Sequence, residues 1–167
     1  MSIKIKSFQI VVCLLLVLGT KSIFGTPESL SGIEDVNFMD QKQIIKRYFQ
    51  GLEKASYEDV ISLFARDAIV LSPLYGKIEA VKFYKELFAV TNDSKITLKN
   101  IFINPDNPKV AAAHFYYDWT LKDGTPAPFE CVDIFEFSSD SNQVVKLTII
   151  YDTARTRKAF EKVSAEH

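Results

Sequence analysis

The sequence is poor in the residues that build metal centres and disulfides. It contains two cysteines and two histidines in 167 residues, too few and too scattered for a metal-binding cluster. If the first 25 residues are cleaved, as argued below, Cys131 is the only remaining cysteine and an internal disulfide is excluded. The P-loop, G-x-G-x-x-G and G-x-S-x-G motifs are also absent from the sequence. We therefore predict no metal and no cofactor.

An excess of positive charge is missing as well. The chain carries 20 basic and 21 acidic residues. Residues 1–25 hold three of the lysines and no acid, so 17 basic and 21 acidic residues remain after cleavage, a net charge of about −4. Nucleic-acid binding needs clustered Lys and Arg, so this balance argues against a nucleic-acid partner.

The first 25 residues have the three-part layout of a secretory signal. Lys4 and Lys6 form a basic start, residues 10–18 are an unbroken apolar run, and residues 22–25 offer a cleavage site after Gly25. Nine apolar residues are too few to span a bilayer, which needs about 20. We expect a cleaved signal, a secreted or periplasmic protein and no membrane association afterwards. An uncleaved anchor is the alternative.

The remaining chain has the size and composition of one folded domain. Hydrophobic residues make up 47% of the sequence, and 13 phenylalanines supply material for a core. We predict a flexible lead-in over residues 26–39, a folded domain over residues 40–155 and a charged tail over residues 156–167. The segment from residue 153 to the end is predicted to form a loose helix.

Hydrophobic spacing predicts three helices in the first half of the domain. Asp40 and Gln43 form a capping-box pattern at the start of the first helix, and Ser56 with Asp59 repeats the signal for the second. A short strand over residues 68–71 and a Pro-Leu-Tyr-Gly turn precede the third helix. The predicted buried positions are Ile44, Ile45, Tyr48, Phe49 and Leu52 on the first helix, Val60, Leu63 and Phe64 on the second, and Val81, Tyr84, Leu87 and Phe88 on the third.

From residue 95 the hydrophobic period changes to two, which predicts strands. Their ranges are 96–104, 110–121, 129–137 and 144–152. Three helices followed by an antiparallel meander predict an α+β fold in which the curved sheet wraps the helices as a cone. The open end of such a cone suits a small apolar molecule. An apolar outer face of the sheet predicts a homodimer.

One carboxyl group interrupts an apolar strand face. Asp133 shares its face of the strand over residues 129–137 with Phe129, Cys131, Phe135 and Phe137. A buried carboxylate without a partner is costly, so such a group pairs or stays protonated. A neutral acid in an apolar pocket can donate a hydrogen bond to a developing oxyanion. The alternative is that this face points outward, and periodicity alone leaves both open.

Short motifs spread over residues 40–155 point to a known superfamily. They are residues 47–49 (RYF), 63–70 (LFARDAIV), Ser72-Pro73 with Gly76, 132–137 (VDIFEF) and 150–152 (IYD). Together they resemble the nuclear transport factor 2-like superfamily, with ketosteroid isomerases and SnoaL-type polyketide cyclases as the most similar branches. The resemblance implies the cone fold. It leaves the reaction open, because this fold hosts many unrelated functions.

The resemblance also implies roles for single residues. Tyr48 matches the isomerase tyrosine that donates to the substrate oxyanion, Asp133 its protonated acid partner, and Tyr84 a tyrosine that supports the first. Ser72 stands where the isomerases carry their proton-shuttling aspartate, just before Pro73. A serine hydroxyl is not a base near neutral pH without an activating neighbour, so the familiar isomerase mechanism is not expected.

Replacement acids and bases lie on the strands. His114 and Asp118 share one face of the strand over residues 110–121 with Tyr116 and Thr120, and they are candidate acid-base residues if that face lines the cavity. The alternative is a solvated face, because the opposite one is more apolar. Asp152 is a further cyclase-like acid, or else a cap for the tail helix. The residues of that more apolar face are Phe115, Tyr117, Trp119 and Leu121.

Two functions follow as expectations. The first is a secreted SnoaL-like domain that binds a small apolar or polyketide-like molecule and catalyses a proton transfer or isomerisation. The alternative is a non-catalytic binding or assembly module on the same scaffold. Convergence of Tyr48 and Asp133 in an enclosed pocket separates the two. The predicted ligand-binding residues are Ser72, Tyr84, Phe129, Cys131, Phe135 and Tyr151.

Overall fold

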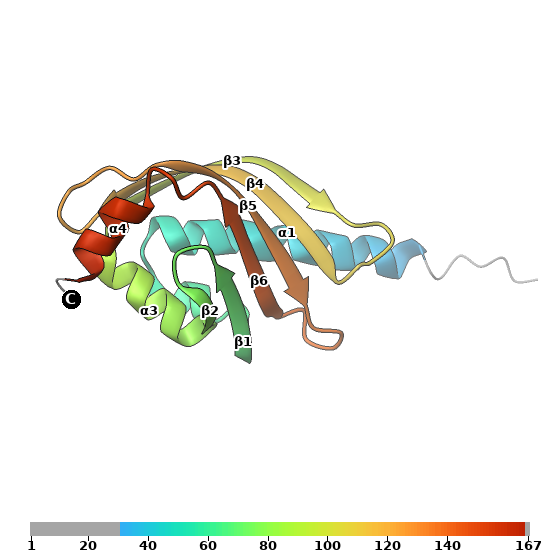
Figure 1. Ribbon diagram of the computed structural model, residues 1–167. Coiled ribbons are helices and arrows are strands. Elements are labelled where there is room, and N and C mark those ends of the chain that lie inside the picture. The colour runs from blue at the N-terminus through green and yellow to red at the C-terminus, as the bar shows by residue number, and fades with distance from the viewer. Residues whose placement is uncertain (1–30, 166–167) are drawn as a thin grey trace, which may run out of the picture.

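A computed structural model of the chain describes residues 31–165, with side chains described from Gln41 onward. The predicted signal, residues 1–25, lies outside this range. The described residues form four helices and six strands in the order α1, α2, β1, β2, α3, β3, β4, β5, β6, α4. Figure 1 shows strands β3 to β6 arching over α1 and α3, so the concave side of the sheet faces the helices. The predicted α+β class with a curved sheet is confirmed.

Helix α1 spans Ser31–Glu53 and begins earlier than predicted. The capping pattern of Asp40 and Gln43 predicted a start at residue 40, but both residues lie inside the helix. Residues 33–39 contain neither Pro nor Gly, so no residue there stops the helix from extending towards Ser31. The predicted apolar face is confirmed. Its buried side chains are Ile45, Tyr48, Phe49 and Leu52.

Helix α2 begins at the predicted signal but is shorter than predicted, so Leu63 and Phe64, which were predicted on its buried side, are buried beyond its end. Helix α2 spans Tyr57–Ile61, and the Ser56 hydroxyl accepts a hydrogen bond from the Asp59 backbone N–H at 3.4 Å, which confirms the predicted cap.

Helix α3 spans Ala80–Val90 and has the larger buried face. Of the positions predicted to be buried, Tyr84 and Leu87 are buried, whereas Val81 and Phe88 are partly exposed. The buried residues of the helix are Ala80, Phe83, Tyr84, Leu87 and Val90.

The strands form one open sheet in the order β2-β1-β6-β5-β4-β3. The antiparallel meander is confirmed for β3 to β6, but β1 pairs with β6 in parallel. Because β1 precedes the third helix, a crossover and not a hairpin sets its direction relative to β6. The strand bounds are Phe64–Ser72 (β1), Gly76–Glu79 (β2), Thr91–Ile103 (β3), Val110–Leu121 (β4), Phe129–Phe137 (β5) and Val144–Tyr151 (β6).

Strand β2 was not predicted. It pairs antiparallel with the end of β1, with Ser72 opposite Gly76. Gly76 has a φ of +72°, a conformation that glycine adopts without the steric cost of a side chain. The Pro-Leu-Tyr-Gly segment is therefore a hairpin turn, and it holds Leu74 and Tyr75 at the end of β1.

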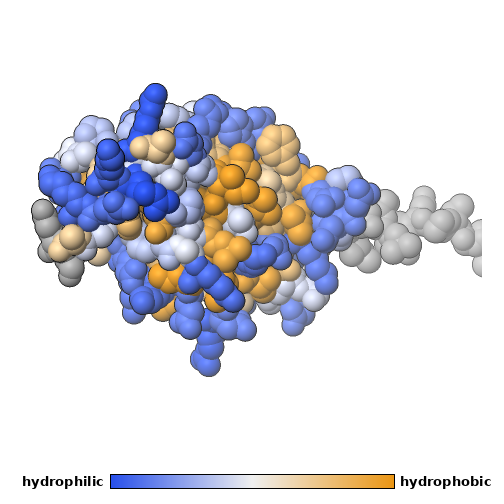
Figure 2. Space-filling view, viewed as in Figure 1, coloured by the Kyte–Doolittle hydropathy of each residue, from blue (hydrophilic) through white to orange (hydrophobic). Residues whose placement is uncertain are grey.

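Alternation along β4 and β5 separates an inner from an outer face of the sheet. On β4, Phe115, Tyr117 and Trp119 are buried, whereas Tyr116 and Asp118 are exposed. On β5, alternate residues from Cys131 to Phe137 are buried, which decides between the two directions that periodicity left open for this face. Figure 2 shows that part of the outer surface over the strands is hydrophobic, with hydrophilic surface around it.

The segment predicted as a charged tail contains helix α4, Arg157–Ser164. Phe160 and Val163 are buried, and the Phe160 ring lies 4.9 Å from the Tyr75 ring and 6.5 Å from that of Trp119, measured between centroids. The predicted helix is thus confirmed, and it packs on the domain. Of the helices described, none combines the length and the hydropathy needed to cross a membrane.

Candidate functional site

An aromatic pocket opens on the concave side of the sheet. The volume of the pocket that is open to the centre of a water molecule is about 40 Å³. A single water needs roughly 10–15 Å³ on the same measure. The space free of atoms, open solvent at the mouth included, is about 470 Å³. The rings therefore narrow the pocket without filling it. Its lining residues are Tyr48, Leu52, Ser72, Leu74, Tyr75, Phe83, Leu87, Phe115, Tyr117, Trp119, Phe129, Cys131, Asp133, Ile149 and Tyr151.

A chain of hydrogen bonds ends on Asp133 inside this pocket. The Tyr84 hydroxyl donates to the Tyr48 hydroxyl at 3.2 Å, and Tyr48 donates to Asp133 Oδ2 at 3.3 Å. The Cys131 thiol donates to Asp133 Oδ1 at 3.3 Å. Helices α1 and α3 thus supply the two tyrosines, and β5 supplies the acid and the thiol. Tyr48 and Asp133 therefore converge in the pocket, which is the geometry stated above as the criterion between the two expected functions.

Burial controls the protonation of Asp133. Its side chain is 1% exposed, and burial raises its pKa from 3.8 to about 7, while the hydrogen bonds from Cys131 and Tyr48 oppose the rise. Within the described residues its side-chain bonds come from neutral groups, and no cation pairs with it. At neutral pH the pocket therefore holds an acid that is protonated in a large share of the molecules.

The two tyrosines stay protonated and act as donors. Burial raises the pKa of Tyr48 well above 10, and the neighbouring Tyr84 and Asp133 raise it further. Burial raises the pKa of Tyr84 as well, whereas its hydrogen bond to Tyr48 lowers it. Tyr84 lies behind Tyr48 and does not line the pocket, so its contact is with Tyr48 and not with a ligand.

Ser72 lines the pocket but acts on the backbone. Its hydroxyl oxygen accepts hydrogen bonds from the N–H groups of Leu74 and Tyr75, both at 3.3 Å. These bonds hold the hairpin turn at the pocket mouth. With its oxygen used as an acceptor of two backbone donors, Ser72 gives no sign of activation as a base.

The predicted acid-base residues of the strands lie outside the pocket. His114 is on the outer face of β4, where its Nε2 lies 2.6 Å from Glu130 Oε1, and Glu130 also pairs with Lys99. Asp118 is exposed on the same outer face. The hypothesis that these two residues line the cavity is wrong, because the more apolar face of β4 turns inward.

Asp152 also lies away from the pocket. It is exposed after the end of β6, and its Oδ1 accepts a hydrogen bond from the Ala154 backbone N–H at 2.9 Å. This bond forms a local turn. Helix α4 begins five residues later, at Arg157, so Asp152 is neither a pocket acid nor the cap of that helix.

Four of the six predicted ligand-binding residues line the pocket, namely Ser72, Phe129, Cys131 and Tyr151. Phe129 and Tyr151 stack with their ring centroids 3.9 Å apart. The other two, Tyr84 and Phe135, do not line it. Phe135 packs behind Tyr48 with centroids 5.3 Å apart and is fully buried, so it supports the site as part of the core.

The sequence reasoning missed part of the wall. Leu52 and Leu87 were assigned to helix packing and Leu74 and Tyr75 to a turn, because periodicity does not tell a core position from a pocket wall, and Phe83 was not singled out. Phe115, Tyr117 and Trp119 could have been predicted as pocket residues, because they lie on the more apolar face of β4. Where the structure describes the chain, no three His, Cys, Asp or Glu side chains gather closely enough to hold a metal ion.

The comparisons with known proteins agree with this architecture. The family model described as SnoaL-like domain matches residues 45–146, a range that includes Tyr48, Ser72 and Asp133. No curated protein matches the sequence at a significant level.

Solved structures share the fold at low sequence identity. A candidate isomerase from Bacillus subtilis has a TM-score of 0.65 and 14% identity, covering 75% of this chain and 95% of that one. PrhC from Penicillium brasilianum has a TM-score of 0.64 and 14% identity, covering 78% and 91%. A nuclear transport factor 2-like protein of unknown function from Exiguobacterium sp. has a TM-score of 0.56 and 17% identity, covering 65% and 98%. At these identities the likeness establishes the fold alone.

Proposed function

The chain belongs to the SnoaL-like domain family, and we propose that it binds a small, largely apolar molecule through one oxygen atom held by Tyr48 and protonated Asp133. The observation that carries the proposal is the buried Tyr84–Tyr48–Asp133 chain of hydrogen bonds at the wall of an aromatic pocket. A protonated carboxyl has one O–H to donate, and Tyr48 donates a second hydrogen bond when its O–H turns from Asp133 Oδ2 to the ligand. A ligand carbonyl oxygen placed beside them receives up to two hydrogen bonds in a site of low polarity.

The pocket walls favour a flat, apolar ligand body. Trp119, Phe129 and Tyr151 present ring surfaces, while the hydroxyl of Tyr117 is engaged by Ser94 at 2.8 Å. Aromatic rings pack well against flat apolar groups in offset or edge-on arrangements. Because the free space is small, a ligand of more than a few heavy atoms extends into the open mouth.

Acetophenone is a suitable first probe, because it joins a carbonyl group to a flat ring. We expect its Kd to increase about tenfold per pH unit above pH 7, because ionised Asp133 no longer donates a hydrogen bond. We expect Tyr48→Phe to weaken binding about tenfold, as expected for loss of one buried hydrogen bond. Tyr116→Phe is the matched control, since Tyr116 lies on the outer face and its loss leaves the Kd unchanged. Equal effects of the two variants would contradict the proposal.

A second candidate function is proton transfer or isomerisation in the bound ligand. The pKa of Asp133 at about 7 favours it, because an acid-base catalyst works best when its pKa lies near the working pH. Ser72 at the position of the isomerase base disfavours it. Exchange of the acetophenone methyl hydrogens in D₂O, followed by NMR, tests this candidate. Faster exchange with the wild-type protein than with Asp133→Asn supports catalysis, and equal rates leave a non-catalytic binding module.

We also propose that the protein is exported, to the periplasm or outside the cell. The basic start, the apolar run and the cleavage site of residues 1–25 support this. N-terminal sequencing of the protein purified from its host tests it. A mature protein that starts at Thr26 agrees with the proposal, and an intact N-terminus in the cytoplasm contradicts it.

A homodimer formed through the outer face of the sheet is part of the same proposal. Phe102, Tyr116 and Ile150 project from that face and are 54%, 38% and 52% exposed, respectively. Exposed apolar side chains on a sheet face favour pairing with a second copy. Light scattering is expected to give the mass of a dimer for the wild type and of a monomer for Ile150→Glu. A monomeric wild type contradicts the dimer.

A further inference from the structure

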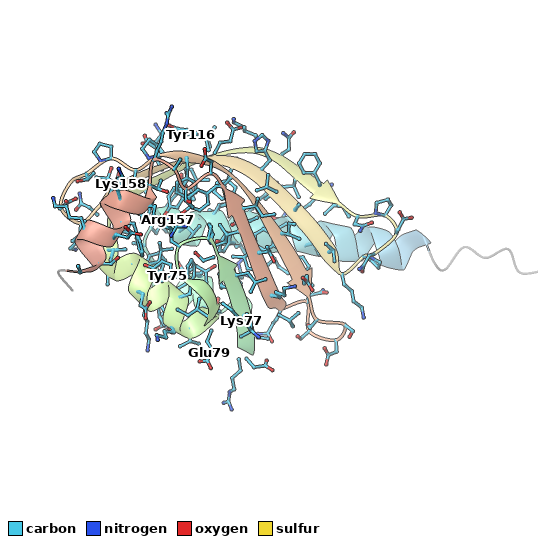
Figure 3. All side chains as sticks on the ribbon, in the orientation of Figure 1. Tyr75, Lys77, Glu79, Tyr116, Arg157 and Lys158 are labelled. Atoms are coloured by element: carbon cyan, nitrogen blue, oxygen red, sulfur yellow. The ribbon has the colours of Figure 1, made fainter. Side chains whose placement is uncertain are left out.

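The pocket mouth lies between two segments that are far apart in the sequence. The β1–β2 turn with Leu74 and Tyr75 forms one side, and Phe129 with Tyr151 forms the other. These four lining residues are partly exposed, unlike the fully buried ones deeper in the pocket. Figure 3 shows Tyr75 and Arg157 at the same end of the molecule, beneath the arch of the sheet.

Arg157 links the two sides of this mouth. Its Nη2 donates a hydrogen bond to the Pro73 carbonyl oxygen at 2.9 Å and another to Thr153 Oγ1 at 3.3 Å. Pro73 lies in the β1–β2 turn, and Thr153 follows β6. Burial raises the pKa of Tyr151, and the positive charge of Arg157 opposes that rise, so this charge acts on a residue of the pocket wall.

The position of Arg157 is fixed by its helix. Arg157 is the first residue of α4, and Phe160 on the next turn packs against Tyr75 and Trp119, two residues of the pocket wall. A guanidinium held in this way loses little conformational freedom when it binds a further group.

The charge of Arg157 has no counterion in the described part of the chain. A guanidinium has five N–H donors, and the two acceptors that Arg157 contacts are a neutral carbonyl and a neutral hydroxyl. No carboxylate of residues 41–165 forms an ion pair with it, whereas Lys162 on the same helix pairs with Asp123. Lys158, beside Arg157 in Figure 3, adds positive charge, and the surface around α4 is hydrophilic in Figure 2. A chain with more acidic than basic residues thus places unpaired positive charge at its pocket mouth.

We propose that Arg157 recognises a carboxylate on the ligand, so that the ligand is an amphipathic acid with its apolar body in the pocket, an oxygen at Tyr48 and Asp133, and its anionic group at the mouth. This inference rests on the proposed function. The guanidinium fork matches a carboxylate with two parallel hydrogen bonds, and an ionic hydrogen bond is about twice as strong as a neutral one. The donors of Arg157 other than Nη2 are available for it.

Two matched ligands test the inference with the full chain. 4-Acetylbenzoate carries a ketone and a carboxylate at opposite ends of one ring, and 4-acetylbenzamide replaces the carboxylate by a neutral amide. We expect the wild type to bind the benzoate about tenfold more tightly than the benzamide, in line with one charged hydrogen-bonded contact. This preference decreases as salt is added, because the contact is partly exposed.

Three variants locate the source of the preference. Arg157→Gln is expected to reduce the preference for the benzoate over the benzamide to about onefold, and Arg157→Lys to retain part of it, because lysine keeps the charge without the planar fork. Lys162→Gln is the control, since it removes a charge from the same helix away from the mouth and is expected to keep the full preference. The preference is a ratio of two Kd values measured on the same variant, so a general change in the mouth affects both values, and binding of the benzamide shows that the pocket of each variant is folded.

The outcomes separate this inference from the proposed function. If acetophenone and the benzamide bind through Tyr48 but the benzoate is not preferred, or if Arg157→Gln keeps the preference, the carboxylate proposal is wrong and the proposed function stands. If the benzoate is preferred and Lys162→Gln abolishes the preference equally, the effect is one of net charge and the role of Arg157 is overturned. If none of the three ketones binds, both are wrong.

Discussion

Glu130 and Asp133 lie three residues apart on β5 and face opposite sides of the sheet. Glu130 is exposed and pairs with Lys99 and His114, and these hydrogen bonds lower its pKa. Asp133 is buried among neutral groups, and burial raises its pKa to about 7. One strand therefore carries a carboxylate that is ionised at neutral pH and an acid that is partly protonated.

The comparison shows which feature marks a site for chemistry in this fold. The outer cluster has the residue types of an acid-base site, with a histidine and a carboxylate 2.6 Å apart, yet both side chains are partly solvated and the pair is an ordinary surface contact. The inner cluster consists of Tyr48, Cys131 and Asp133, which include no histidine and no ion pair. Burial keeps Asp133 partly protonated at neutral pH. Enclosure distinguishes the two, more than residue type does.

The largest expected difference between the two carboxyls is in the pH dependence of stability. Between pH 4 and 7 folded Asp133 holds a proton that the unfolded chain has released, so the free energy of unfolding decreases as the pH rises through this range. A pKa rise from 3.8 to about 7 corresponds to about 4 kcal/mol. Asp133→Asn is expected to remove this decrease, as measured by urea unfolding from pH 4 to 8.

Glu130→Gln is the matched control for that experiment. Its lowered pKa stabilises the folded state above the ordinary pKa of a glutamate, and this contribution is lost as the pH falls through the folded value. The variant is therefore expected to keep the decrease between pH 4 and 7. A wild type and an Asp133→Asn variant with parallel pH profiles would contradict the assignment.

The next largest effect is expected for Tyr48→Phe. The change removes the donor to Asp133 and the acceptor of the Tyr84 hydroxyl. We expect a loss of about 1–3 kcal/mol in the free energy of unfolding, together with a higher pKa for Asp133. Tyr116→Phe on the outer face serves as the control. If Tyr48→Phe leaves the pKa of Asp133 where it is, the hydrogen bond between them does not form in solution.

Substitution of Cys131 is expected to have a smaller effect. Its thiol is a weak donor to Asp133 Oδ1. Cys131→Ala removes the donor and is expected to raise the pKa of Asp133 by less than Tyr48→Phe does. Cys131→Ser replaces it with a stronger donor and is expected to lower that pKa. Shifts of the same sign in both variants would mean that packing, and not the hydrogen bond, sets the effect.

The smallest effect is expected for His114→Gln on the outer face. The change removes an exposed ion pair with Glu130, and such pairs contribute little to stability. We expect no change in the urea midpoint at pH 7 and no change in acetophenone binding. A loss of binding would mean that the outer cluster communicates with the pocket, against the separation of the two faces.

Much of the fold followed from the sequence because its signals are local. The alternation of apolar and polar residues predicted β4 and β5 with their observed bounds, and Ser56 with Asp59 predicted the start of α2. The parallel pairing of β1 with β6 was missed, because a helix and four strands lie between these two strands in the chain. Strand β2 was missed because its four residues gain their structure by pairing with β1 and not from a pattern of their own.

Site residues were predicted where they match residues of a known family. They were missed where their role depends on which side of the sheet is buried. The resemblance pointed to Tyr48 and Asp133, which meet in the pocket, and to Tyr84 as the support of Tyr48, whereas the predicted contact of Tyr84 with a ligand is not found. His114 was a candidate acid-base residue because the ordinary pKa of histidine lies near neutral pH. Which side of its strand faces the pocket depends on the packing of the whole sheet, and the pattern within the strand does not show it. The sequence did not place Arg157 at the mouth, because its contact with Pro73 joins residues 84 positions apart.

The central claim is that burial keeps Asp133 partly protonated at neutral pH. Carboxyl-carbon NMR across a pH titration of the protein measures this directly, and Glu130 in the same spectra is an internal reference. The account predicts a pKa of about 7 for Asp133 and a lowered pKa for Glu130. A value near ~4 for Asp133, the ordinary value of an exposed aspartate, would contradict the account, because the pocket would then hold a solvated carboxylate and no proton donor.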